Sequence, residues 1–340
     1  MSAPGSVTLP DFRYDIEADW HPLLTCNFRC SYCFFPTNVL GQKLRIFASV
    51  EDWRGAFDAT GKRWLIHITG GEPTIYPQFV DLCDGLTRTH IISLNTNLSN
   101  SCVKEFARRI DPLRVSFINA GLHIDERRRR RGVERFIEHA RDVQDAGFRI
   151  IPTIVATPAV VAELPELTAQ FAAQGLWLTP KILRGEFEGR QYPQGYRAED
   201  QSMLRTAILQ AREHYADRFA GADAMGRPSI DVFSDDELLA SYPDFAGRPC
   251  SAGMKFVRIS PNGDVHRCSR KTPLGNLLRG TMQLNPTPTL CDTKYCVYFC
   301  KKYTADAAAM PLTSAMPRPS LSGLSIPAKH AVPLGRRALL

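Results

Sequence analysis

Short apolar runs alternate with amphipathic segments along residues 20–184 of this 340-residue chain. The runs are continuously apolar, as in strands that are covered on both faces. This alternation predicts strand–helix units in a parallel sheet with right-handed crossovers. Six units are too few for the eight of a closed barrel, so we expect an open, partial (β/α)6 barrel. The predicted strands are residues 20–25, 64–69, 91–96, 114–119, 148–156 and 176–183.

The alternation stops after residue 184, and a polar stretch with a helical pattern near residues 199–218 follows. Beyond it, two short apolar runs flank the sequence PNGD, whose Asn262–Gly263 step is a hairpin signal. We therefore expect a small cysteine-rich α+β unit built from a β-hairpin and a helix. The predicted organisation is an N-terminal extension (1–19), the barrel (20–184), a connector (185–249), the cysteine-rich unit (250–304) and a flexible tail rich in Ala, Pro and Ser (305–340).

Polar residues recur where the predicted strands end. In parallel α/β sheets, ligand-binding groups gather at this carboxyl edge, so the edge is the expected site. The residues are Cys26, Cys30 and Cys33 after the first strand, Gly70–Pro73 after the second, Asn95 and Asn97 at the third, and Ser116 with Asn119 at the fourth.

Cys26, Cys30 and Cys33 have the spacing C-x3-C-x2-C, and no further cysteine occurs before Cys83. A structural zinc site takes four protein ligands, so one interpretation is a zinc site completed by a distant histidine. Three thiolates from one tight loop also suit a [4Fe–4S] cluster that leaves one iron without a protein ligand.

The cysteine spacing, with aromatic Tyr32 before the third cysteine, resembles the signature of the radical SAM superfamily. The sequence TGGEP at residues 69–73 resembles the second motif of that family. The resemblance implies that the open iron binds S-adenosylmethionine and that an electron from a flavodoxin or ferredoxin-type protein cleaves it. The resulting 5′-deoxyadenosyl radical would abstract a hydrogen from the substrate. The backbone of Gly70 and Gly71 and the carboxylate of Glu72 would hold the methionine amine.

Further cofactor contacts are expected by strand position. Asn95, Asn97 and Ser116 are candidates for the ribose and carboxylate of the cofactor, and Tyr32 and the Val155 region for flanking the adenine. Residues 127–131 are five consecutive arginines, and one interpretation is a solvated start of a helix. The alternative is that Arg128 or Arg131 binds the cofactor carboxylate or a substrate phosphate. His123 is expected near the same edge in a structural role. The predicted cofactor-binding set is Tyr32, Gly70, Gly71, Glu72, Pro73, Asn95, Asn97, Ser116 and Arg128.

A second group of cysteines lies near the predicted hairpin. Cys250 and Cys268 flank it, and Cys291, Cys296 and Cys300 follow with spacing C-x4-C-x3-C. The hairpin spacing resembles the auxiliary-cluster domains of radical SAM enzymes, called SPASM and twitch. Five thiols suffice for one four-cysteine cluster, so the resemblance implies a twitch-like domain with one auxiliary [4Fe–4S] cluster. Cys250, Cys268 and two of the later three cysteines would bind it, the remaining thiol being a candidate hydrogen donor; zinc is the alternative metal.

The charge of the chain indicates which kinds of partner it can bind. The formal net charge is +7 and the pI is near 8.9, which favours an anionic partner such as a nucleotide, a phosphorylated substrate or an acidic redox protein. No basic stretch interleaved with aromatics suggests nucleic-acid binding, and neither a secretory signal nor a membrane-spanning run is recognised. We therefore expect a cytoplasmic protein whose ten cysteines form no disulfides and whose clustered cysteines bind metal.

The substrate is less determined than the cofactor. The first expectation is epimerisation, dehydrogenation or carbon–carbon bond formation on a sugar, nucleoside or nucleotide-sugar in a biosynthetic pathway. The alternative is a maturase that modifies a ribosomally made peptide or a protein side chain. About 20 residues precede the first predicted strand, too few for a leader-binding domain, which favours the first. A zinc-rich binding module without catalysis is a third interpretation.

Overall fold

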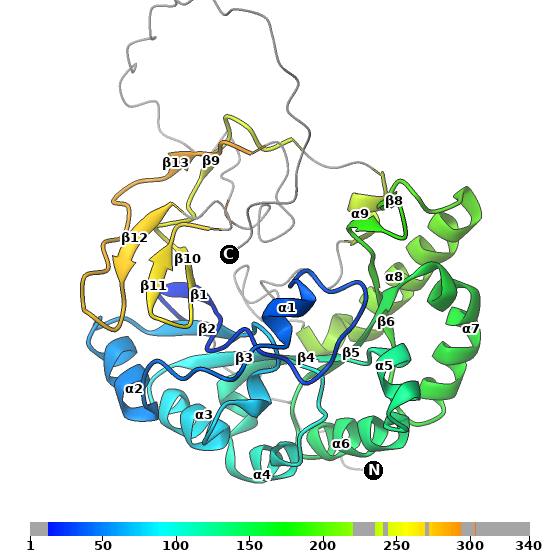
Figure 1. The fold of residues 1–340 in the computed structure, drawn as a ribbon, viewed down its shortest axis with the longest axis horizontal. Coiled ribbons are helices and arrows are strands. Elements are labelled where there is room, and N and C mark those ends of the chain that lie inside the picture. Colours follow the sequence, from blue (N-terminus) through cyan, green and yellow to red (C-terminus); the bar gives the residue numbers. More distant parts are fainter. Residues whose placement is uncertain (1–12, 220–234, 241–243, 269–271, 294–302, 304–340) are drawn as a thin grey trace, which may run out of the picture.

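The structure is a computed structural model that describes residues 13–219, 235–240, 244–268, 272–293 and 303. Six parallel strands that pair in sequence order form its centre, with β6 at one edge of the sheet (Figure 1). The partial (β/α)6 barrel expected from the alternation is thus confirmed. The strands are β1 (Ile16–Trp20), β2 (Trp64–Ile68), β3 (Ile91–Thr96), β4 (Val115–Gly121), β5 (Ile150–Ala156) and β6 (Thr179–Ile182).

Helices cover the convex face of this curved sheet (Figure 1). The first of them, α2, begins with a capping box, in which the Ser49 hydroxyl accepts from the backbone N–H of Asp52, and the Asp52 carboxylate accepts from that of Ser49. The elements are α2 (Val50–Asp58), α3 (Phe79–Thr87), α4 (Cys102–Arg109), α5 (Ile124–Arg129), α6 (Val133–Asp145) and α7 (Pro158–Ala172), with 3-10 turns η1 (Pro73–Ile75) and η2 (Pro112–Arg114).

The connector carries the predicted long helix, α8 (Ala198–Phe219), and a small hairpin of β7 (Gly185–Phe187) and β8 (Arg190–Tyr192). A shorter helix, α9 (Asp235–Ala240), packs against α8 and β6. None of the described helices is both long enough and apolar enough to cross a membrane.

The predicted hairpin is present as β10 (Phe256–Ile259) and β11 (Asp264–His266), which pair antiparallel around the Asn-Gly turn. The sequence does not reveal that β10 also pairs in parallel with β1. The hairpin and one further strand beside β11 therefore extend the six-stranded barrel sheet to nine strands. The remaining elements are the edge strand β12 (Pro273–Asn276), the pair β9 (Pro249–Cys250) and β13 (Thr289–Leu290), and the short helix α1 (Thr37–Leu40).

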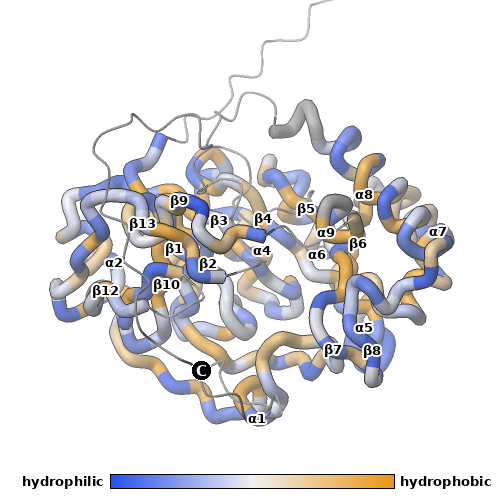
Figure 2. The backbone as a smooth tube through the Cα atoms, turned by 90° about the horizontal axis from the view of Figure 1, so that it is seen from above, coloured by the Kyte–Doolittle hydropathy of each residue, from blue (hydrophilic) through white to orange (hydrophobic). Residues whose placement is uncertain are grey.

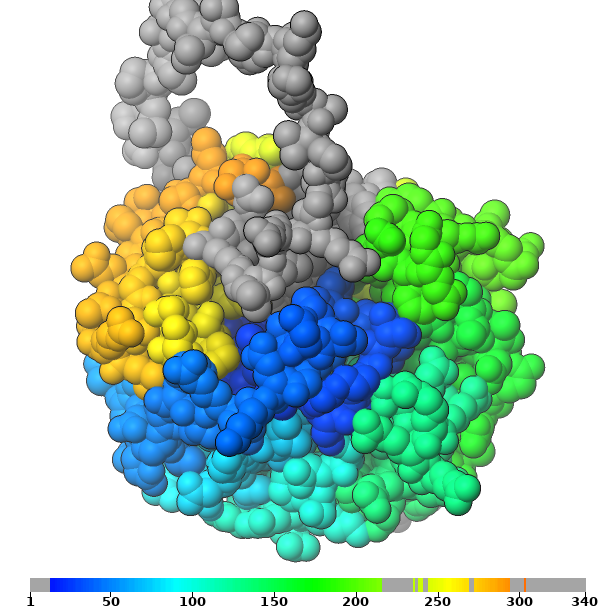
Figure 3. Space-filling view, viewed as in Figure 1, coloured from blue at the N-terminus to red at the C-terminus, as the bar shows by residue number. Residues whose placement is uncertain are grey.

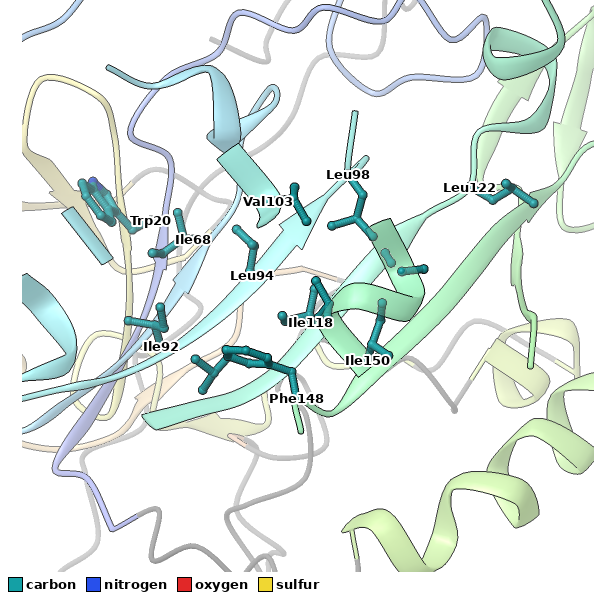
Figure 4. Packing of buried hydrophobic residues seen from close by; sticks show 14 of the residues in the cluster. Trp20, Ile68, Ile92, Leu94, Leu98, Val103, Ile118, Leu122, Phe148 and Ile150 are labelled. Carbon is teal, nitrogen blue, oxygen red and sulfur yellow. The ribbon is translucent and has the colours of Figure 1, made fainter. Parts of the chain in front are cut away.

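The core lies between the sheet and the outer helices. Alternate strand residues such as Ile68, Leu94 and Ile118 pack there against helix side chains (Figure 4). At one end, Trp20 packs against Trp53 of α2, with ring centroids 4.7 Å apart. Figure 2 shows the apolar residues concentrated along the central strands, and polar residues along the outer helices. The opposite faces of the strands are therefore available for polar groups.

The first strand is the main error of the sequence prediction. It was expected at residues 20–25, but β1 ends at Trp20 and begins inside the range expected to be an extension. Pro22 lacks the N–H that a ladder needs, so the apolar run after Trp20 forms a loop. In β1 itself, Ile16, Ala18 and Trp20 join the core while Glu17 and Asp19 alternate with them. Glu17, which is buried, and Asp19, which is half-buried, interrupt the continuous apolar run that is typical of a strand covered on both faces.

Candidate functional site

The three clustered cysteines lie on the loop between β1 and α1, which is exposed on one face between the hairpin and the later helices (Figure 3). Burial is the main cause that raises the pKa of the Cys26 thiol to about 11 and that of Cys30 to about 12, and the charge of Cys33 contributes to both shifts. The three thiols are thus close enough to influence one another. Among the described residues, no three such side chains are already arranged to hold a metal ion. Because the thiolate is the ligand form of cysteine, binding a metal here would release the thiol protons.

The glycines of the TGGEP stretch hold this cysteine loop. The N–H of Gly71 donates to the Leu23 carbonyl at 3.1 Å, and that of Glu72 to the Thr25 carbonyl at 3.0 Å. A Cβ on Gly71 would lie 2.0 Å from the Thr25 oxygen, and one on Gly70, whose φ is +109°, would lie 2.3 Å from the Leu23 oxygen. The close approach expected of these glycines is therefore an approach to the chain's own backbone, just before Cys26.

The Glu72 carboxylate is buried and engaged by the protein. It accepts from the Thr74 N–H at 3.1 Å and the Asn97 N–H at 2.7 Å, and also from the Thr74 and Thr96 hydroxyls. Burial raises its pKa, and these donors oppose the shift. Glu72 therefore ties β2, η1 and the end of β3 together, with Pro73 at the first position of η1. Its bond to a cofactor amine stays a prediction.

The asparagines at the carboxyl edge form a hydrogen-bonded row. Asn95 donates to Thr69 at 3.1 Å, Asn119 donates to Asn95 at 2.9 Å, and the Thr153 hydroxyl donates to Asn119 at 2.7 Å. This row crosses β3, β4 and β5 on the face opposite the apolar core. Asn97 instead donates to Asn27 of the cysteine loop at 2.9 Å. The edge thus offers amide donors and acceptors beside the three cysteines.

Two residues that were predicted to bind the cofactor lie away from the carboxyl edge of the sheet. Ser116 is the second residue of β4, near its amino end, because the strand runs to Gly121 rather than stopping at residue 119. Arg128 is exposed and forms a bidentate ion pair with Glu163 of α7, with N–O distances of 3.2 and 2.6 Å. Arg128 therefore points to the outer helix layer, and the interpretation of a solvated entrance is the better one for it.

The arginine that points inward is Arg127, which is 1% exposed. It donates to the carbonyls of Leu122 and Gly132 at 2.8 and 3.1 Å and to that of Asn97, and its guanidinium lies over the Phe28 ring. Helical geometry allows only part of a consecutive run to point one way, but the sequence gives no signal for which residue does so.

His123 is the other residue whose position the sequence missed. Its Nδ1 lies 3.4 Å from the Cys30 Sγ and 2.9 Å from the Tyr32 hydroxyl, and the two rings are nearly parallel, with centroids 6.1 Å apart. Burial lowers the pKa of His123 to about 4, so the imidazole is neutral near pH 7. Tyr32, expected to flank an adenine, therefore has its hydroxyl engaged by His123.

The second cysteine group is partly brought together. Cys250, Cys268 and Cys291 lie in one packed group of side chains with Phe256 and Tyr303. Backbone bonds place Cys291 beside β9, since its N–H donates to the Arg248 carbonyl at 2.9 Å. The other two predicted ligands, Cys296 and Cys300, lie outside the described residues. None of the eight described cysteines is in a disulfide.

The chain is similar to known proteins over most of this region. The model of the radical SAM superfamily matches residues 21–172. Mycofactocin maturase MftC of Mycolicibacterium smegmatis is 25% identical over 259 residues, which cover 73% of this chain and 63% of that protein. The PqqA peptide cyclase of Xanthomonas oryzae pv. oryzae is 23% identical, over 72% of this chain and 65% of its own. The chain thus spans less than two thirds of the length of these relatives.

Among solved structures, SuiB of Streptococcus suis bound to its precursor peptide SuiA superposes with a TM-score of 0.50 and 16% identity. The match covers 80% of this chain and 65% of SuiB, which has also been solved with S-adenosylmethionine. At this identity the match establishes the fold alone.

These comparisons contradict the first expectation about the substrate. The two curated relatives are named as a maturase and as a peptide cyclase, and neither is named for a sugar or a nucleotide. The prediction of a sugar, nucleoside or nucleotide-sugar substrate is therefore wrong, and the alternative, a peptide maturase, agrees better with them. The family itself rests on a match that includes the cysteine loop and the TGGEP stretch. The family model thus identifies residues 21–172 as a radical SAM domain.

Proposed function

We propose that this protein is a radical SAM maturase that modifies a side chain of a peptide. The observation that carries the proposal is the position of the three thiols at the carboxyl edge of the sheet, beside the row of amides. The loop that carries these thiols is held by the hydrogen bond from the Gly71 N–H to the Leu23 carbonyl. The peptide substrate is inferred from the relatives, which are a maturase and a peptide cyclase.

The donor set fits the cofactors that the family implies. Cys26, Cys30 and Cys33 would hold a [4Fe–4S] cluster, because soft thiolates are the ligands that such clusters require. When bound, cluster and S-adenosylmethionine supply reductive cleavage of a sulfonium bond and hydrogen abstraction from the substrate. The protein's part is to orient the cofactor and exclude water. Asn95 is proposed as its polar contact, since it lies within the amide row.

We further propose an auxiliary [4Fe–4S] cluster on Cys250, Cys268 and later cysteines. The proposal is supported by the packing of Cys250, Cys268 and Cys291 in one group of side chains, although Cys291 is far from Cys250 in the sequence. Electron delivery by a flavodoxin or ferredoxin-type protein agrees with the net charge of +7.

Anaerobic reconstitution followed by a cleavage assay tests the proposed activity. With dithionite and S-adenosylmethionine, the wild-type protein should release methionine. The C26A/C30A/C33A variant should release none and should retain about half of the iron, since one of two four-iron clusters is lost. Cleavage by the triple variant at the wild-type rate would refute the site. Formation of 5′-deoxyadenosine should also rise with a short peptide encoded beside the gene, and a response to sugars or nucleotides alone would refute the peptide substrate.

A complementary variant tests the auxiliary cluster. In C250A/C268A the iron content should again fall to about half, because one four-iron cluster has lost two of its ligands. The cluster on Cys26, Cys30 and Cys33 should still cleave S-adenosylmethionine without substrate. C83A is the matched control, since Cys83 is buried in α3 among apolar residues. Iron content unchanged from wild type, or zinc in place of iron by elemental analysis, would exclude the auxiliary cluster.

A further inference from the structure

His123 reaches the cysteine loop from β4. Its Nδ1 is 3.4 Å from the Sγ of Cys30 and 2.9 Å from the hydroxyl of Tyr32. The imidazole and phenol rings are nearly parallel, at 17° with centroids 6.1 Å apart, and the Phe28 ring meets the imidazole edge-on at 87°. The side chain is therefore enclosed by residues of the cysteine loop.

The backbone around His123 is shaped to place this ring. His123 has a φ of +47°, a left-handed conformation that costs a residue with a Cβ about 1 kcal/mol or more. Gly121, two residues earlier, leaves room for the ring, because a Cβ there would lie 2.4 Å from the His123 Nε2. Both features bring the imidazole against Cys30. An incidental contact would require neither.

A second contact holds the same two segments together. The Glu126 carboxylate, three residues beyond His123, accepts from the N–H of Arg29 at 3.0 Å. That carboxylate also forms ion pairs with Arg129 and Arg130. The β4–α5 turn is thus fixed to the cysteine loop on both sides of Cys30, and the distance from His123 to Cys30 is set by the fold.

A metal-bound thiolate only accepts hydrogen bonds, whereas an imidazole N–H and a phenol O–H donate them. Donation to a cluster thiolate draws electron density from the sulfur and favours the reduced cluster. The Tyr32 hydroxyl also hydrogen-bonds the Cys30 sulfur. We propose that the Nδ1–H of His123, together with the Tyr32 hydroxyl, donates to the Cys30 sulfur and raises the reduction potential of the cluster at Cys26, Cys30 and Cys33. His123 is thereby a positioning residue, and the inference rests on the proposed cluster.

The test compares variants that keep the left-handed backbone. Glycine adopts a positive φ freely and asparagine tolerates it, so H123G and H123N remove the imidazole without straining the turn. Y32F removes the second donor and keeps the aromatic ring. R128A is the matched control, because Arg128 is exposed and paired with Glu163. The reconstituted full chains are titrated by spectroelectrochemistry, following the EPR signal that S-adenosylmethionine perturbs.

In H123G and H123N, the potential of that cluster should shift to more negative values, with iron content equal to wild type. Y32F should shift in the same direction by a smaller amount, and R128A should not shift. Wild-type potentials in both His123 variants would overturn the inference, as would loss of iron in both with no shift in the clusters that remain. If the wild-type protein shows no signal that responds to S-adenosylmethionine, the proposed function fails first and the inference fails with it.

Discussion

Replacing Arg127 with alanine should lower the free energy of unfolding by about 3 to 4 kcal/mol, whereas the same change at Arg128 should cost less than about 1 kcal/mol. Arg127 is buried and donates to three backbone carbonyls, those of Leu122, Gly132 and Asn97. Its guanidinium also lies between the rings of Phe28 and Phe136, at 5.4 and 4.5 Å from their centroids. R127A leaves the buried carbonyls unpaired and opens a cavity.

Arg128 is the matched control because it is the next residue of the same run. Its side chain is 47% exposed and that of its partner Glu163 is 46% exposed, so solvent screens the pair. Urea unfolding of the metal-free proteins under reducing conditions measures both changes, with equal m-values required for the comparison. Equal midpoints for R127A and R128A would show that the buried arginine does not hold the loops together.

Replacing Gly71 with alanine should prevent assembly of the cluster on Cys26, Cys30 and Cys33. The new Cβ would lie 2.0 Å from the Thr25 oxygen, a backbone atom that a side-chain rotation cannot move. The cysteine loop must shift away from β2, breaking the bond from the Gly71 N–H to the Leu23 carbonyl. We expect G71A to be destabilised by about 2 kcal/mol or more and to lose the iron of this site.

Gly55 provides the control for this change. It lies in α2 with nothing within 4 Å of an added Cβ, so G55A should stabilise the protein by about 0.5 to 1 kcal/mol. Iron per chain and S-adenosylmethionine cleavage are measured on both variants, with the urea midpoint as the measure of stability. A G71A protein that retains wild-type iron and midpoint would mean that the loop is not held by Gly71.

The two predictions depend on contacts between segments remote in sequence, and these are the contacts that the sequence conceals. The run of five arginines gives no indication that Arg127 alone is directed at the end of β3, because the orientation of α5 sets its direction. His123 looks like an isolated histidine until β4 and the cysteine loop are adjacent. Glu72 looks like a cofactor ligand until its two threonines and Asn97 surround it.

The sequence by itself determined the alternation of strands and helices, the carboxyl-edge position of the cysteine loop and of TGGEP, and the hairpin at its Asn-Gly turn. These features are encoded locally, since apolar periodicity, turn residues and thiol spacing reflect burial and backbone geometry within a few residues. The tertiary structure alone decided the start of β1, the pairing of β10 with β1, the buried arginine and the contact of His123 with Cys30. Each of these depends on which distant segments pack together, and that choice is made by the whole core.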